Sequence, residues 1–417
     1  SKMAIVNGLF GTAALPTDFA SKSFAAMLTK FKPGGGNATL FAMTSMLKDE
    51  PNVINTEHGY WSKAMVFPSV TLTAAVADGV ATTFTVADSS QILPNVILRV
   101  ASTGEHVLVT AVPSGTSLTV IRAFGSVAGA AISNSVKLYQ VSTAFEEGSV
   151  RPTALSITPT QIKNYTQIFR NSWVQTRTAA VVAKVAGGDS LSECRADAVD
   201  LHAINIETAL IFGQKFSGTK NGQPIRQMEG LISMIGTLAY YPPSYAATNT
   251  TTLGATTTYD QLLTAVDPVF NQVSYGSSNG GDGSRVMLCG AQAVNVLHAI
   301  GRKTGQYHLV DGQNSYGLQF SSIKFPRGVM RIVEHPLFNT NSDWSKMALV
   351  VDPGAFSVGY LGGAKTLVQQ YDAGGNEVNH IPDNGMDASG GTLTTEMTCL
   401  SKNIPANAVI YNFTAAA

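Results

Sequence analysis

The sequence predicts an α+β protein with a small all-β domain inserted into it, and three observations lead to this prediction. Residues 68–140 consist of short β-rich runs separated by turn signals. A helical period of three to four residues begins after Gly187 and Gly188 and continues to Gly213. From Ser322 onward the pattern is that of strands again. Strands and helices therefore occupy separate stretches of the chain, as in α+β folds.

Length and composition favour a folded protein whose surface meets other chains. The 417 residues suffice for two or three domains with sizeable cores. Only 13% of residues are charged and 44% are hydrophobic, which excludes a disordered chain. Lys plus Arg equals Asp plus Glu at 27 each, so net charge recruits neither nucleic acid nor a membrane as a specific partner. So few charges predict that much of the surface is covered by other chains.

The cysteines and the N-terminal sequence indicate the cellular compartment in which the protein is made. Cys194, Cys289 and Cys399 are isolated, without a CxxC pair, which predicts free thiols in a reducing cytosol. The sequence begins without a signal-peptide pattern, and no apolar stretch approaches the ~18 residues of a transmembrane helix. We therefore expect a soluble protein made in a cytoplasm, without a membrane partner.

The first 47 residues are irregular and basic. They contain Pro16, Pro33 and three consecutive glycines at 34–36. Their charged residues are Lys2, Lys22, Lys30 and Lys32, with Asp18 as the single acid. This composition predicts an arm that lies against another chain.

Residues 68–140 predict an all-β domain that folds on its own. The expected strands are Thr82–Val86, Val96–Leu98, Val107–Val109 and Leu118–Ile121. Extended segments flank the domain at Val53–Phe67 and Phe145–Val182. Its charges balance internally, with Asp78, Asp88 and Glu105 against Arg99, Arg122 and Lys137. Both of its ends join the flanking segments, so we expect them to lie close together.

Capping signals predict where the helices begin. Ser190 and Glu193 form a capping box, so a helix of about 35 Å should run to Phe212. Thr258 and Gln261 repeat the pattern, and Pro268 should break or restart this second helix near Asp267. The remaining expected elements are a strand at Arg285–Cys289, a helix at Gln292–Lys303, and strands at Val329–Val333, Met347–Val351, Phe356–Leu361 and Thr366–Gln370.

No motif predicts catalysis, a cofactor or a metal. Gly359–Thr366 resembles a phosphate loop but has Ala364 in place of the second glycine and too short a following segment, which favours a turn between strands. Glu146 and Glu147 are adjacent on an extended chain and face opposite sides, so they cannot flank one bond. The seven histidines lack metal-ligand spacing: His58, His106, His202, His298, His308, His335 and His380. We therefore expect no catalytic, cofactor-binding or metal-binding residues and no enzyme.

Aromatic residues with a basic neighbour at Tyr165, Phe169, Arg170 and Trp173 have two readings. They could stack on single-stranded nucleic acid. In an extended, alternating segment they could instead lie half buried between strands or chains, and the pattern favours this second reading.

The order of several short segments resembles major capsid proteins of tailed bacteriophages with the Hong Kong 97-type fold. Within that family the sequence is similar to the subgroup whose E-loop carries an inserted β-domain. The resemblance covers about residues 50–365. The segments that carry it are Asn164–Phe169, Glu193 with Arg195, Ile206–Gly213, Met228–Ile232, Cys289–Gly290, Glu334–Leu337 and Val350–Pro353.

This resemblance implies an assignment of domains. The long helix would be the spine helix of the P-domain, and the A-domain loops would meet around the five- and six-fold axes. The implied ranges are 1–47 for the N-terminal arm, 48–67 and 141–182 for the E-loop, 68–140 for the inserted domain, 183–229 and 351–417 for the P-domain, and 230–350 for the A-domain.

The resemblance also implies a function. The chain would assemble as hexamers and pentamers into an icosahedral shell around double-stranded DNA, in the cytoplasm of a bacterial host. Separate scaffolding, portal and decoration proteins would be partners, and Lys22, Lys30 and Lys32 would contact DNA without sequence preference. The inserted domain would lie on the outer surface. The alternatives are a shell that holds protein cargo, and a tail-fibre or carbohydrate-binding structural protein.

Overall fold

The computed structural model contains two compact units. The smaller comprises Gly59–Ile162 and Thr237–Thr248, and the larger contains the rest of the described chain. The predicted arm, residues 1–47, lies outside the described residues. Those described are 48–50, 53–63, 68–152, 154, 158–182, 190–241, 245, 247–271, 284–304, 310–315, 318–363, 365–371, 377–378 and 387–415.

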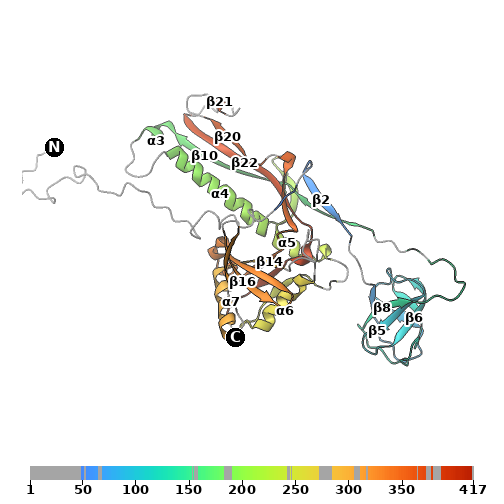
Figure 1. Ribbon diagram of the computed structural model, residues 1–417. Helices are drawn as coiled ribbons and strands as arrows, with labels where there is room; N and C mark the ends of the chain where they lie inside the picture. Colours follow the sequence, from blue (N-terminus) through green and yellow to red (C-terminus); the bar gives the residue numbers. More distant parts are fainter. Residues whose placement is uncertain are drawn as a thin grey trace, which may run out of the picture. The chain divides into compact units, whose positions relative to one another are not determined.

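The smaller unit is built on a six-stranded antiparallel sheet in the order β3-β8-β5-β6-β7-β4 (Figure 1). A bridge between Leu72 and Val86 joins the two outer strands, and Ala87 N–H donates to the Thr71 carbonyl at 2.9 Å. The sheet therefore closes into a barrel. Its strands are β3 (Ser69–Thr71), β4 (Thr83–Thr85), β5 (Val96–Val100), β6 (His106–Ser114), β7 (Ser117–Ile121) and β8 (Lys137–Thr143).

Alternating side chains of these strands fill the barrel. Phe84, Leu98, Leu118 and Leu138 are completely buried in a single apolar core. The four strands expected from the sequence coincide with β4 to β7, so those predictions are confirmed.

In the larger unit, the helix α4 (Ser190–Phe212) lies along a sheet in the order β1-β19-β22-β20-β21, with β10 also paired to β22 (Figure 1). Trp173, Ala198 and Leu393 form the core between helix and sheet. The sheet contains β1 (Lys48–Asp49), β10 (Gln167–Thr176), β19 (Phe356–Tyr360), β20 (Leu367–Tyr371), β21 (Glu377–Val378) and β22 (Ala388–Ser401).

A second sheet of the larger unit has seven strands in the order β13-β23-β18-β14-β17-β16-β15. The helices α6 (Tyr259–Phe270) and α7 (Ala291–Thr304) pack on one face of it, around Met287, Met330 and Val350. Its strands are β13 (Thr250–Thr252), β14 (Ser284–Cys289), β15 (Val310–Ser315), β16 (Leu318–Phe325), β17 (Gly328–Glu334), β18 (Ala348–Val351) and β23 (Ala408–Tyr411).

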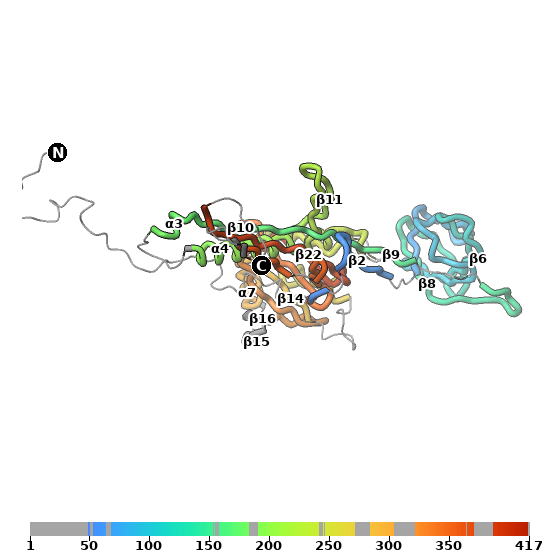
Figure 2. Tube along the Cα trace, turned by 90° about the horizontal axis from the view of Figure 1, so that it is seen from above, coloured from blue at the N-terminus to red at the C-terminus, as the bar shows by residue number. Residues whose placement is uncertain are grey.

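Two strand pairs and two short helices complete the described elements used below. β2 (Glu57–Ser62) pairs with β9 (Thr160–Tyr165). β11 (Phe216–Lys220) and β12 (Gln223–Gln227) form a hairpin that stands away from the body of the larger unit (Figure 2). The short helices are α3 (Arg177–Val181) and α5 (Leu231–Gly236).

The helix starts largely follow the sequence. α4 covers the predicted range, although the Ser190 side chain lies outside the described residues and its capping box stays a prediction. The second capping box is confirmed, because Gln261 N–H donates to Thr258 Oγ1 at 3.2 Å and Thr258 N–H donates to Gln261 Oε1 at 3.4 Å.

Two expectations about helices are wrong. Pro268 does not break α6 near Asp267, because it sits in the final turn, where its missing N–H removes a single bond, and the helix continues to Phe270. The segment predicted as extended up to Val182 ends in the one-turn helix α3, capped by Thr176 Oγ1, which accepts from Ala179 N–H at 3.3 Å. Because α3 buries no residue, it leaves no hydrophobic period in the sequence.

Candidate assembly surfaces

A buried asparagine joins three parts of the larger unit. Asn164 in β9 donates through Nδ2 to the carbonyls of Glu229, at 3.0 Å, and Cys399, at 2.8 Å. Its Oδ1 accepts from the N–H of Glu229 at 2.8 Å and of Tyr165 at 2.9 Å. One amide side chain thus connects β9, the loop before α5, and β22, with all of its hydrogen-bonding capacity used.

The Cys399 thiol belongs to the same group of buried hydrogen bonds around Asn164. Its Sγ lies 3.0 Å from the Glu229 carbonyl. Burial raises the pKa of this thiol, and the nearby Glu229 raises it further. Burial and the charge of Glu334 raise the pKa of the Cys289 thiol in the same way. Both cysteines are therefore neutral structural side chains, since the thiolate is the reactive form.

A buried histidine–glutamate pair connects α4 to the segment after β17. His335 Nε2 lies 3.0 Å from Glu207 Oε1, and both side chains are fully buried. His335 Nδ1 accepts the Leu337 N–H at 3.3 Å, so the ring hydrogen sits on Nε2 and makes a hydrogen bond to Glu207 Oε1. The pair fixes the end of the long helix against the second sheet.

A second histidine lies between α4 and the sheet beneath it. His202 contacts Asn171 Oδ1 and Thr395 Oγ1, both at 2.8 Å. Burial lowers the pKa of His202, which favours the neutral ring at this helix-sheet contact. Phe169 packs edge-on against it, with ring centroids 6.5 Å apart.

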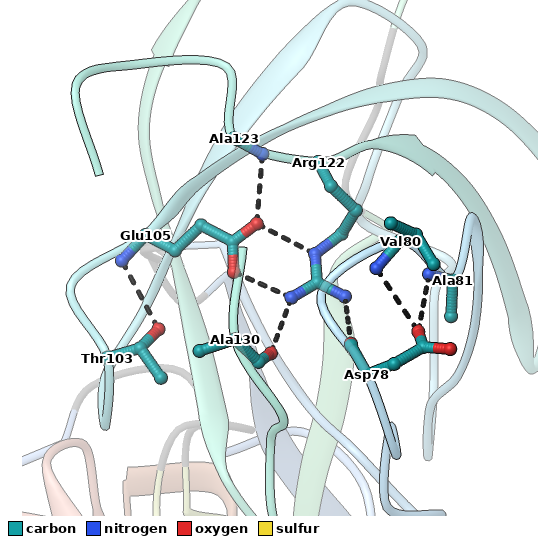
Figure 3. A network of polar contacts seen from close by, with 8 residues as sticks. All are labelled: Asp78, Val80, Ala81, Thr103, Glu105, Arg122, Ala123 and Ala130. Atoms are coloured by element: carbon teal, nitrogen blue, oxygen red, sulfur yellow. Dashed lines mark hydrogen bonds and ion pairs between the residues drawn. The ribbon is translucent and has the colours of Figure 1, made fainter. Parts of the chain in front are cut away.

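In the barrel, Glu105 and Arg122 form a buried ion pair (Figure 3). Arg122 Nε and Nη2 each lie 2.7 Å from a Glu105 carboxylate oxygen, and Ala123 N–H donates to the same carboxylate at 2.9 Å. The guanidinium also donates to the carbonyls of Asp78, at 3.0 Å, and Ala130, at 2.7 Å. This one side chain therefore holds together segments that lie far apart in the sequence.

The ion pair sets the ionisation of Glu105. Burial of the carboxyl raises its pKa, but the Arg122 guanidinium and the Ala123 N–H oppose this effect, and the pKa ends below its ordinary value. A carboxyl whose pKa is lowered by folding stabilises the protein above its unfolded pKa.

We therefore expect the barrel to lose stability in acid. The contribution of Glu105 should be complete above its ordinary pKa of 4.5 and should disappear as the pH falls through the lowered folded value. Thermal unfolding of the full chain should be compared between wild type and Glu105→Gln from about pH 7 to about pH 3. The difference in Tm should shrink as the pH falls, and a constant difference would contradict this account.

Several large apolar side chains are exposed in β2, in the segments next to the strands and in α3. Trp61 in β2 is 68% exposed, and Ile54 just before this strand is 88% exposed. Val150 and Val181 are 88% and 79% exposed. Exposed aromatic and aliphatic side chains on protruding segments are typical of surfaces that another chain covers.

The residues considered as sites in the sequence do not come together. Gly359–Thr366 contains a short 3₁₀ turn at Leu361–Gly363 between β19 and β20, which confirms the connecting-turn interpretation. Phe169 packs against His202 of α4 and Trp173 lies in the core beneath α4, so both are buried within the fold and not half buried between strands or chains as expected. Tyr165 is partly exposed and Arg170 is exposed. Glu146 and Glu147 are exposed. In the described ranges, no three His, Cys, Asp or Glu side chains are grouped so that they could share a metal ion.

A groove of about 510 Å³ lies between the end of α6 and the β16–β17 turn. Apolar side chains, among them Leu263, Phe270 and Phe325, line most of it. Arg327 at its rim pairs with Asp267 at 3.0 Å, and both side chains are about half exposed. The groove thus brings no buried acid, base or nucleophile to one point. None of the helices in the described part of the chain combines the length and apolar character needed to cross a membrane.

Comparison with known proteins identifies what these surfaces build. Residues 12–414 match the family model described as SU10 major capsid protein. The chain belongs to this family. The major capsid protein of Pseudomonas phage PaMx41 is 37% identical over 402 residues, which cover 94% of this chain and 93% of that protein. The SU10-family chain is thus the major capsid protein of a phage and forms the capsid shell.

Solved structures agree about the fold of this SU10-family protein. The capsid asymmetric unit of cyanophage A-1(L) matches with a TM-score of 0.52 at 10% identity, over 96% of this chain and 98% of that chain. The fold is of the Hong Kong 97 type, as the resemblance implied. The holo-SrpI encapsulin complex from Synechococcus elongatus PCC 7942 matches over 63% of this chain and 80% of that chain, with a TM-score of 0.41 and 10% identity. The family match and the PaMx41 relative support a phage capsid over a shell for protein cargo and over a tail-fibre protein.

Proposed function

We propose that this capsid protein assembles as hexamers and pentamers into an icosahedral shell around double-stranded DNA, in the bacterial cytoplasm, and that it catalyses no reaction. The exposed Trp61 and Ile54 carry the proposal. Such exposed apolar side chains lose contact with water only when another subunit covers them. Family membership supplies the second support.

We also propose the domain roles implied by the resemblance. The arm would be 1–47, the inserted domain 68–140, the P-domain 183–229 with 351–417, and the A-domain 230–350. For the E-loop, predicted at 48–67 and 141–182, we propose a shorter second limb that ends at residue 166. The reason is that β10 pairs along its whole length with β22 and packs under α4.

The partners follow from the same proposal. Separate scaffolding, portal and decoration proteins would act with the shell, and the barrel would lie on its outer surface. Contact with DNA would be weak and independent of sequence, through Lys22, Lys30 and Lys32. These lysines lie outside the described residues.

Imaging and absorbance of purified particles test the proposal. Negative-stain microscopy of the expressed full chain should show closed particles with icosahedral outlines. Particles from infected cells should show the absorbance of nucleic acid, and nuclease should not remove it. Open sheets or filaments would contradict the shell geometry, and particles that contain only protein would contradict the DNA content.

Deletion of residues 1–47 should separate folding from assembly. We expect the shortened chain to keep its helical circular dichroism signal and its unfolding transition, because α4 and both sheets of the larger unit lie outside this range. It should fail to form regular particles, since the arm is proposed to bind neighbouring subunits. Regular particles from the deletion variant would overturn the role of the arm.

A further inference from the structure

Three exposed side chains and one partly exposed histidine lie in a row across the outside of the barrel. Tyr139 in β8 lies directly opposite Arg99 in β5, and Arg99 lies opposite His106 in β6. Phe124, just after β7, lies beside the end of the row, because its N–H donates to the His106 carbonyl at 2.9 Å. Residues paired in register on neighbouring strands point to the same face. We call these four residues the barrel row.

The barrel row is both accessible and basic. Tyr139 is 48% exposed and Phe124 is 42% exposed, while Arg99 is exposed and His106 is partly exposed. Lys137, two residues before Tyr139 in β8, is also exposed and adds a second permanent positive charge to this face. Neighbouring strands lie about 4.8 Å apart, so the three strands place the row over about 10 Å, and Phe124 extends it.

No carboxylate of the neighbouring strand neutralises the row. Glu105 precedes His106, but it is completely buried and is bound by Arg122 inside the barrel. Aromatic side chains beside arginine are the residue types enriched in protein interfaces. The chemistry of the row therefore fits an acidic peptide segment with apolar flanks.

The same chain carries such a segment directly after β8. Residues 145–150 are all exposed. Glu146 and Glu147 stand between two apolar residues, Phe145 at 44% and Val150 at 88% exposure. Ser149 N–H donates to the Glu146 carbonyl at 3.2 Å, and Gly148 has a φ of +77°, so the acidic pair is held in a turn. We call residues 145–150 the acidic turn.

We propose that the barrel row of one subunit binds the acidic turn of a second copy of this chain. Glu146 and Glu147 would face Arg99 and Lys137, and the apolar flanks would meet the aromatic side chains. Every copy carries one row and one turn, so the contact is head-to-tail and can close a ring. This inference rests on the proposed shell, and it names one contact between its subunits.

Charge reversal on each side tests the contact in the full chain. Arg99→Glu with Lys137→Glu, and separately Glu146→Lys with Glu147→Lys, should each raise the protein concentration needed for particle assembly about fivefold. The combination of all four changes should return this concentration to within about twofold of wild type, because both charges are exchanged. The control is Lys324→Glu, an exposed charge on β16, which should change it little.

The outcomes separate this inference from the proposed function. Two outcomes would contradict the contact but leave the proposed shell unaffected, provided that wild type forms shells. In the first, neither charge reversal changes the concentration needed for assembly. In the second, combining the two reversals does not restore assembly. If wild type forms no closed particles under any condition, the proposed function itself fails.

A cysteine pair decides whether the contact joins two chains. Tyr139→Cys combined with Glu147→Cys should give covalent dimers and longer oligomers when assembled particles are oxidised and separated under denaturing conditions. Each single variant is a control for the native cysteines, of which Cys194 is partly exposed. An oxidised product that stays entirely monomeric would overturn the proposal.

Discussion

Replacing Arg122 with methionine should destabilise the barrel by about 3–5 kcal/mol, because the change leaves the Glu105 carboxylate buried without its counter-ion. The variant also removes the donors that bind the carbonyls of Asp78 and Ala130. Calorimetry of the full chain should show the loss as a lower unfolding temperature for one transition. A change below about 1 kcal/mol would show that the pair does not hold the barrel together.

A matched control uses the exposed ion pair of the larger unit. Arg327→Met breaks the pair with Asp267, whose side chains are about half exposed, and should cost at most about 1 kcal/mol. Combining Arg122→Met with Glu105→Leu removes both buried charges. This double variant should lose less stability than Arg122→Met alone, because no unpaired charge remains inside the barrel.

Asn164→Leu should cost about 3 kcal/mol or more in the larger unit. The change removes a hydrogen-bond partner from four backbone groups: the N–H of Tyr165, the N–H and carbonyl of Glu229, and the carbonyl of Cys399. The Glu229 carbonyl keeps only the weaker contact with the Cys399 thiol. Each buried polar group without a partner costs about 1–3 kcal/mol. Chemical denaturation of the full chain, followed by circular dichroism, should show the loss.

Two further variants distinguish lost hydrogen bonds from altered packing. Asn164→Asp keeps the size of the side chain but places a carboxylate oxygen against two carbonyls, so it should be at least as destabilising as Asn164→Leu. Asn205→Leu is the control, because Asn205 is exposed and makes a single long contact of 3.5 Å. If the stability of Asn164→Asp is close to that of wild type, the contact between β9, β22 and the loop before α5 does not depend on the N–H donors of Asn164.

Local signals in the sequence predict the elements well. The range of α4 follows from the glycines that flank it in the sequence, Gly188 and Gly213, whereas its apolar side chains do not form a single buried face, since Leu201 is 52% exposed. The Thr258 cap is a contact between residues three positions apart, so the sequence contains both partners side by side. The barrel strands follow from turn residues and alternation.

The buried polar contacts between elements could not be predicted in this way, because the residues that form them are remote in sequence. Asn164 and Cys399 are 235 residues apart, and Glu105 and Arg122 are 17 apart, one just before β6 and the other just after β7. Charge counting indicated only that the barrel is balanced, and it did not show that one pair is buried while Asp78 and Asp88 stay exposed. No sequence pattern paired Glu207 with His335, because their contact depends on how α4 meets the second sheet.

Closure of the barrel has a consequence for the fidelity of assembly. A strand at an open edge would offer its N–H and carbonyl groups to the same strand of any neighbouring copy, and such backbone pairing is hard to undo and does not depend on side chains. The bridge from Leu72 to Val86 pairs those edge groups within one subunit. Contacts made by the barrel must therefore depend on side chains, which are weaker and more selective. A subunit that binds in a wrong orientation can then dissociate before the shell closes around the error.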